Sequence, residues 1–199
     1  MYLIQNIQEA TYKIERSEFI AYLVPVTTVE QAKENIAERS KKMYRATHNC
    51  WAYIVGEKGE LSHCSDAGEP SGTAGLPILR TLQKYNLTNV ATIVTRYFGG
   101  IKLGVRGLID AYSETTRLAI EVSPLIKLVK TFSYFIEVEY SQLEPLKYHL
   151  NNLHAIITHA DYSNKVVLTI TIEEEFHENC INFLRKIENA GSITVLPME

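Results

Sequence analysis

The sequence predicts an α+β protein built from two domains. Its 199 residues exceed the usual size of one domain, and a content of 46% hydrophobic and 22% charged residues is that of an average globular protein. The helical pattern stops at Pro124, and the charge balance changes nearby. Residues 1–128 hold 15 Lys and Arg against 13 Asp and Glu, whereas residues 129–199 hold 5 against 10. We therefore predict one domain over residues 1–128 and a second over residues 129–199.

The first domain is expected to begin with a buried strand. Residues 17–26 form an apolar run rich in β-branched and aromatic side chains. Thr28 and Gln31 have capping-box spacing and predict that a helix follows. Its apolar residues recur on one face, and they are Val29, Ala32, Ile36 and Met43.

A hairpin, two more helices and a strand are predicted next. Residues 49–55 and 60–64 flank the sequence GEKG, whose glycines can supply the positive φ of a tight turn. Pro77 suits the first turn of a helix that runs through residues 78–85. Residues 88–98 form a β-rich strand, and residues 105–122 form a helix. The buried face of this last helix is expected to hold Val105, Leu108, Ala111, Tyr112 and Ala119.

The second domain has a regular pattern of strands and helices. Strands are predicted at 132–140, 155–162, 166–174 and 192–196, and helices at 142–153 and 176–190. The order βαββαβ is that of the ferredoxin-like unit.

Charge and hydropathy exclude several classes of protein. The N-terminus does not resemble a signal peptide and no long apolar window follows, so we expect a cytoplasmic protein with no membrane partner. The net charge of −3 and the acidic second domain argue against a protein that coats nucleic acid. The three cysteines are expected to be free thiols, and no cofactor is expected.

Two glycine-rich segments stand out. In SDAGEPSGTAGLP, residues 65–77, Asp66 can form an Asx-turn and Ser71 or Thr73 can cap the next helix. In RYFGGIKLGVRGL, residues 96–108, a glycine loop joins a strand to a helix N-terminus. Unpaired amides and the helix dipole both favour negative charge in such a place.

We therefore predict that the two loops form one cleft for a phosphate or carboxylate, with Arg96 at its floor and the helix start near Gly104 at its wall. Arg96 lies on a rigid strand, which suits bidentate contact with an oxyanion. In the alternative, the glycines only allow close packing and Arg96 pairs with Asp66 or Glu69 without a ligand. The predicted ligand-binding residues are Arg96, Gly99, Gly100, Lys102, Gly104, Arg106, Asp66, Gly68, Glu69, Ser71, Gly72, Thr73 and His48.

A metal site is not predicted. His48 and Cys50 lie on one expected strand and His63 and Cys64 on the next, but their spacing is not that of a zinc site. Cys50 is expected to be a buried, inert thiol.

The motifs THNCWAY, SDAGEPSGTAGLPIL and VTRYFGGIKLGVRGLIDAY resemble those of the YigZ/IMPACT family over residues 10–120. The second part resembles the small C-terminal domain of bacterial members. Ala67 and Arg106 depart from the usual pattern, where an acidic residue and a glycine are common.

This resemblance implies a first domain folded like the second domain of a small-subunit ribosomal protein and domain four of elongation factor G. It implies a ferredoxin-like second domain similar to the last domain of that factor. Eukaryotic relatives regulate translation by interfering with activation of a stress kinase. They carry an additional N-terminal interaction domain that is not expected here, so the kinase role is not carried over.

Two functions from different classes follow from these features. A third function, that of a protein–protein regulator, is compatible with all of the features but is specifically predicted by few of them. The first is a translation-associated binding protein that docks on RNA, the ribosome or a translation regulator through the cleft. The second is an enzyme acting on a small phosphorylated or carboxylated substrate. In the enzyme, His48, Asp66, Glu69 and Ser71 would be the acid–base or nucleophilic groups, with Arg96 and Lys102 as the clamp. We favour the binding protein, because no recognisable catalytic set is present.

Overall fold

The computed structural model describes residues 1–197. It contains two compact units, Met1–Leu128 and Val129–Glu199. Both units mix helices with sheets, so the predicted two-domain α+β class is confirmed. None of the helices in the described part of the chain is long and apolar enough to cross a membrane.

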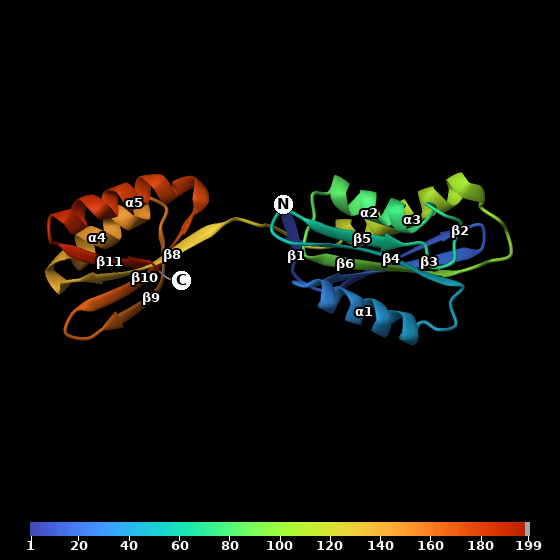
Figure 1. Ribbon diagram of the computed structural model, residues 1–199, viewed down its shortest axis with the longest axis horizontal. Coiled ribbons are helices and arrows are strands. Elements are labelled where there is room, and N and C mark those ends of the chain that lie inside the picture. The colour runs from blue at the N-terminus through green and yellow to red at the C-terminus, as the bar shows by residue number, and fades with distance from the viewer. Residues whose placement is uncertain (198–199) are drawn as a thin grey trace. The chain divides into compact units, whose positions relative to one another are not determined.

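The first unit is centred on a five-stranded antiparallel sheet (Figure 1). Its strand order is β2-β3-β6-β4-β5, so the two strands of the predicted hairpin, β4 and β5, lie at one edge. Gly56 and Gly59 in the hairpin turn have φ of 107° and 67°, as the sequence predicts. The strands are β2 (Gln8–Ile14), β3 (Ser17–Pro25), β4 (His48–Val55), β5 (Leu61–Ser65) and β6 (Val90–Tyr97).

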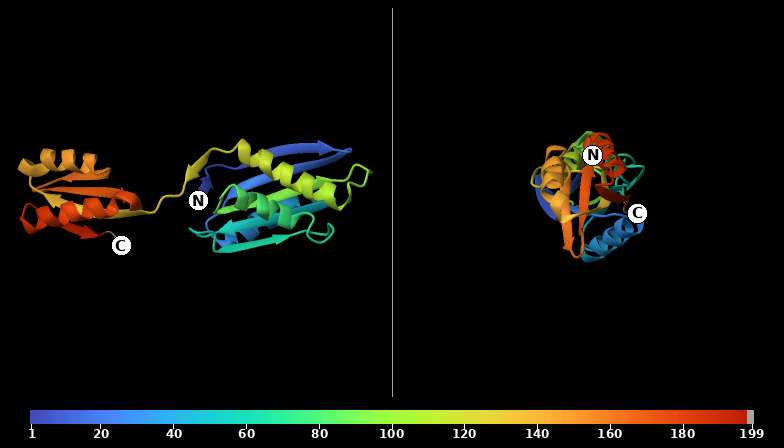
Figure 2. Two further views of the ribbon diagram at one scale, coloured as in Figure 1. Left: turned by 90° about the horizontal axis from the view of Figure 1, so that it is seen from above. Right: turned by 90° about the vertical axis from the view of Figure 1, so that its left-hand side faces the viewer.

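Three helices cover the two faces of this sheet. The helix α1 (Val29–Lys42) packs on one face, whereas α2 (Gly75–Lys84) and α3 (Gly104–Glu121) pack against each other on the opposite face. Figure 2 shows α2 and α3 from above. Each face buries its own apolar cluster, and the larger cluster lies under α2 and α3. Val105 is 62% exposed at the start of α3, so its predicted place in the core is wrong.

Three strands near the ends of this unit were not predicted. The strands β1 (Tyr2–Ile4) and β7 (Leu125–Lys127) pair with each other, and β2 pairs with β3 through a tight turn. That turn holds Glu15 and Arg16 with φ of 44° and 60°, a conformation that normally favours glycine or asparagine. The turn therefore lacks the glycine signal by which a hairpin is recognised in a sequence.

The second unit has the predicted ferredoxin-like arrangement. Its four strands form one sheet in the order β11-β8-β10-β9. Inward side chains of β8 and β10 pack against both helices around a single apolar cluster. The elements are β8 (Thr131–Val138), α4 (Tyr140–Asn152), β9 (Ile156–Tyr162), β10 (Val166–Glu173), α5 (Glu174–Asn189) and β11 (Ile193–Pro197).

Candidate functional site

Asp66 organises the glycine-rich loop that precedes α2. Its Oδ1 accepts hydrogen bonds from the backbone N–H groups of Ala74 at 2.9 Å and Gly75 at 2.8 Å, and its Oδ2 accepts one from Gly72 at 2.8 Å. Burial raises the pKa of this carboxyl, but the three amide hydrogen bonds outweigh burial and hold the pKa below its ordinary value. Asp66 therefore caps α2 from eight residues before the N-cap position, Ala74.

The prediction that Ser71 or Thr73 caps α2 is wrong. The Thr73 hydroxyl donates to the Pro70 carbonyl at 2.6 Å, and the N-cap residue has no side-chain cap of its own. Thr73 is buried and its hydroxyl is hydrogen-bonded within the loop, so this side chain stabilises the loop.

A buried ion pair joins the same loop to the central strand β6. The Arg96 Nη1 atom donates to Glu69 Oε1 at 2.6 Å, and the side chains are only 6% and 3% exposed. The Tyr112 hydroxyl, on α3, donates to the same Glu69 oxygen at 2.9 Å. The pairing of Arg96 with Glu69 that the sequence left open is therefore present.

This ion pair leaves one nitrogen of the Arg96 guanidinium, Nε, buried without a hydrogen-bond partner among the described residues. Its Cζ lies 5.3 Å from the centre of the Phe19 ring and 5.4 Å from that of the Phe98 ring. A guanidinium carries five N–H donors, and leaving buried donors unpaired is costly. The hydrogen-bonding capacity of Arg96 is therefore not fully used within the described part of the chain.

Arg96 lines a cavity of about 460 Å³ in the first unit. Two of its walls come from the segment between β6 and α3 and from the loop that carries Glu69. The lining residues are Thr47, His48, Glu69, Pro70, Arg96, Phe98, Lys102, Leu103, Gly104, Val105 and Leu108. We call this cavity the Arg96 cleft.

The structure brings some of the predicted ligand-binding residues into the Arg96 cleft and leaves others outside its lining. Those in the lining are His48, Glu69, Arg96, Lys102 and Gly104. Those outside the lining are Asp66, Gly68, Ser71, Gly72, Thr73, Gly99, Gly100 and Arg106.

Gly99 has a packing role. A Cβ atom at this position would lie 2.0 Å from the carbonyl carbon and oxygen of Arg16, in the β2–β3 turn. Its amide also donates to the Ser17 hydroxyl at 3.2 Å. Only glycine allows the two backbones to approach this closely.

The start of α3 contributes a second feature that favours anions. Gly104, the first residue of the helix, has φ of 71°, and no side chain caps the helix N-terminus. No acidic residue lies in the first turn. The helix dipole and the amides of the first turn therefore stay free to favour a negative group in the adjoining cleft.

Apolar residues of the cleft were missed as site residues in the sequence. Phe98 is 45% exposed and Val105 is 62% exposed, although both types are usually buried in a soluble domain. The aromatic Phe98 next to two glycines could have been recognised from the sequence. The exposure of Val105 could not have been recognised from the sequence, because Val105 fits the apolar period of α3.

His48 lies beside the ion pair. Its Nε2 atom is 4.0 Å from Glu69 Oε2, and its Nδ1 atom lies 3.0 Å from the Ala67 carbonyl oxygen. The imidazole is partly exposed in the cleft lining. It is therefore placed to hydrogen-bond a ligand or to exchange a proton with one.

Two of the three cysteines, Cys50 and Cys180, are buried and have the character of unreactive thiols. The Cys50 thiol donates to the Asp66 carbonyl at 2.8 Å and contacts the Tyr112 hydroxyl at 3.3 Å, and burial raises its pKa to about 12. Burial also raises the pKa of Cys180 to about 11. Within residues 1–197, no group of three or more His, Cys, Asp or Glu side chains is arranged to hold a metal ion.

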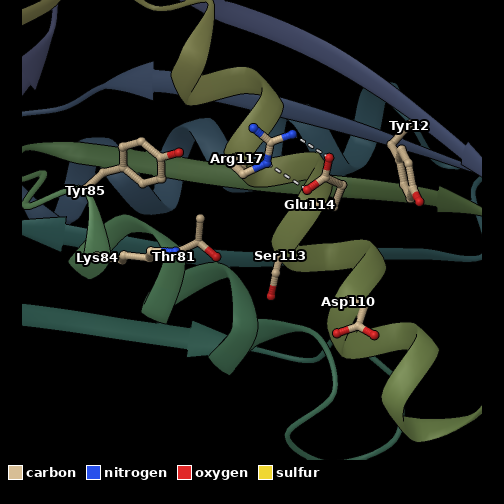
Figure 3. A pocket seen from close by; sticks show the side chains of 8 residues that line it. All are labelled: Tyr12, Thr81, Lys84, Tyr85, Asp110, Ser113, Glu114 and Arg117. Atoms are coloured by element: carbon tan, nitrogen blue, oxygen red, sulfur yellow. Dashed lines mark hydrogen bonds and ion pairs between the residues drawn. The ribbon is translucent and has the colours of Figure 1, made fainter.

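A second cavity, of about 370 Å³, lies between α2, α3 and β2 (Figure 3). Its arginine, Arg117, is engaged in ion pairs. Arg117 donates to Glu114 from Nε at 2.8 Å and from Nη2 at 2.6 Å, and it also pairs with Glu121. Its guanidinium is thus already occupied, in contrast to that of Arg96.

Two family models match the chain. The Impact N-terminal domain matches residues 15–120, and a domain of unknown function, DUF1949, matches residues 136–189. These ranges fall within the two compact units.

Relatives and a solved structure agree with these matches. The IMPACT family member YvyE of Bacillus subtilis is 33% identical over 96% of this chain and 88% of its own length. The IMPACT family member YigZ of Escherichia coli is 30% identical over 94% of this chain and 92% of its own length. The crystal structure of a hypothetical protein, 28% identical, superposes with a TM-score of 0.63 and covers 100% of this chain and 97% of its own. The chain belongs to the IMPACT family.

Proposed function

We propose that this protein is a translation-associated binding protein that docks on RNA, alone or within the ribosome, through the Arg96 cleft. The observation that carries the proposal is the cavity that the buried Arg96 lines beside an uncapped helix start, together with the Arg96 Nε atom, which has no hydrogen-bond partner among the described residues. Lys102, exposed in the same lining, adds a cation that can meet a phosphate. The chain belongs to the IMPACT family, and eukaryotic members of this family regulate translation. Family membership therefore supports the proposed link to translation.

The arrangement of the candidate catalytic groups favours binding over catalysis. Asp66 holds three amides of its own loop, and Ser71 is outside the cleft lining. Of the four candidate groups, His48 and Glu69 alone line the cleft, and one Glu69 oxygen is already shared by Arg96 and Tyr112. A cation and an uncapped helix start are sufficient for binding a phosphate.

The proposal is tested by removing the exposed cation. Lys102→Gln should weaken binding of a fluorescein-labelled single-stranded RNA, measured by anisotropy, about threefold or more, because one phosphate contact is lost. Lys84→Gln is the matched control, since Lys84 is an exposed lysine of α2 in the second cavity. Equal affinity in both variants and the wild type, or no RNA binding at all, would refute docking through this cleft.

A further inference from the structure

The walls of the Arg96 cleft are more apolar than a phosphate-binding surface requires. Phe98 and Val105 are both substantially exposed there, and Leu103 and Leu108 complete the apolar lining. A protein that reads only the phosphate backbone needs exposed cations, whereas an exposed aromatic ring offers a platform on which a base can stack. The cleft therefore suits a ligand that has both a flat apolar part and an anionic part.

The size of the cleft suits a ligand about as large as one nucleotide. Its volume of about 460 Å³ lies in the range of pockets that enclose a small molecule. A base inside a duplex is stacked and paired, and it would have to leave the helix to enter. An unpaired nucleotide of single-stranded RNA can enter without that cost.

The floor of the cleft carries hydrogen-bond donors and an acceptor side by side. Arg96 Nη1 lies 2.6 Å from Glu69 Oε1, and the buried Arg96 Nε atom has no hydrogen-bond partner among residues 1–197. The second carboxylate oxygen, Glu69 Oε2, receives no hydrogen bond within the described part of the chain, and His48 Nε2 is 4.0 Å from it. The pair thus offers donors and an acceptor to the edge of one planar ligand.

Guanine is the base whose edge fits this floor most fully. Its Watson–Crick edge presents O6 as an acceptor for a guanidinium, beside N1–H and the N2 amino group as donors for a carboxylate. Uracil offers one such donor, and adenine lacks the O6 acceptor. In a buried site, a base whose edge leaves its own or the protein's donors and acceptors without partners is rejected.

Building on the proposed function, we infer that the Arg96 cleft binds one unpaired guanosine nucleotide of an RNA strand. The base stacks on Phe98 and meets Arg96 and Glu69 with its edge. Its phosphate stays at the exposed rim, near Lys102 and the start of α3.

The test uses the full chain and three fluorescein-labelled RNAs: the pentamers UUGUU and UUAUU and a blunt duplex. Anisotropy should give about tenfold tighter binding of UUGUU than of UUAUU or the duplex, the discrimination typical of a well-placed base contact. Phe98→Ala should weaken UUGUU binding about tenfold through lost stacking, and Phe98→Trp should retain it. Tyr44→Ala, at an aromatic residue that is 71% exposed outside the cleft, is the control and should bind as the wild type does.

Failure of this inference is distinct from failure of the proposed function. If all three RNAs bind equally and Phe98→Ala has no effect, whereas Lys102→Gln weakens binding, the base site is refuted and docking through the cleft stands. Equal affinity for UUGUU and UUAUU refutes the guanine preference. If Phe98→Trp binds as weakly as Phe98→Ala, stacking is refuted.

Discussion

Replacing Asp66 by Asn tests whether this carboxylate holds the loop between β5 and α2. The side chain keeps its shape, but an amide nitrogen takes the place of the oxygen that accepts from Gly72. One hydrogen bond to a charged acceptor is worth about 1.5–3 kcal/mol, and the bonds from Ala74 and Gly75 lose their charge assistance. We expect the first unit to lose about 2 kcal/mol of its free energy of unfolding.

Urea unfolding followed by tryptophan fluorescence reports on this unit, because Trp51 in β4 is the single tryptophan of the chain. With a typical dependence on urea, a loss of about 2 kcal/mol lowers the midpoint by about 1 M. Asp110→Asn, at an exposed position on α3, is the control and should change stability by less than about 0.5 kcal/mol. A loss in Asp66→Asn no larger than in this control would refute the capping role.

The difference in free energy of unfolding between the wild type and Asp66→Asn should depend on pH in a defined direction. Because the folded pKa of Asp66 is lower than the ordinary value of 3.8, its contribution is complete at neutral pH and is lost as the pH falls through the folded pKa. The difference in free energy of unfolding between wild type and Asp66→Asn should therefore be constant from neutral pH to about pH 5, and should narrow below about pH 4. A difference that widens in acid would contradict the assignment.

Two further predictions concern the packing of the first unit and the thiols. Gly99→Ala should destabilise the unit by about 3 kcal/mol or more, because its Cβ would overlap backbone at 2.0 Å, whereas Gly100→Ala has open space and should lose about 1 kcal/mol from its φ of 88°. Equal urea midpoints for the two variants would refute the close approach. With a disulfide reagent at about pH 8, Cys64 should react first because it is partly exposed, and the buried Cys50 and Cys180, with pKa values of about 12 and 11, should react only on unfolding. Fast modification of all three thiols in the folded protein would contradict their burial.

Local signals predicted much of the fold. Thr28 caps α1, and its hydroxyl accepts from the Gln31 amide at 3.2 Å, as the capping-box spacing indicates. The order of strands and helices in the second unit was also predicted correctly, because each element there carries its own apolar period.

Features that depend on distant partners could not be predicted in the same way. Arg39 lies on the buried side of α1, where it pairs with Glu9 at 2.9 Å and lies over the ring of Tyr22 at 4.5 Å. Both partners belong to strands that are remote in the sequence, and β2 itself was not predicted. From the sequence alone, a charged residue in a helix is expected to be exposed. The partners of Arg39 keep it buried instead.

In the candidate site, too, the features set by local sequence signals were predicted and those set by distant partners were not. The sequence placed Arg96 at the end of a strand and Gly104 at a helix start, because both positions follow from local patterns. It did not distinguish Asp66 from Glu69 as the partner of Arg96, since that choice depends on how the loop folds back. The apolar lining was missed because apolar residues are read as core by default.

The dependence of RNA affinity on salt is the sharpest test of whether Lys102 meets a phosphate at the Arg96 cleft. Each phosphate contact on a single strand adds about 0.7 to the slope of log affinity against log salt concentration. We expect Lys102→Gln to reduce this slope by about that amount and Lys84→Gln to leave it unchanged. Equal slopes for wild type, Lys102→Gln and Lys84→Gln would contradict this expectation.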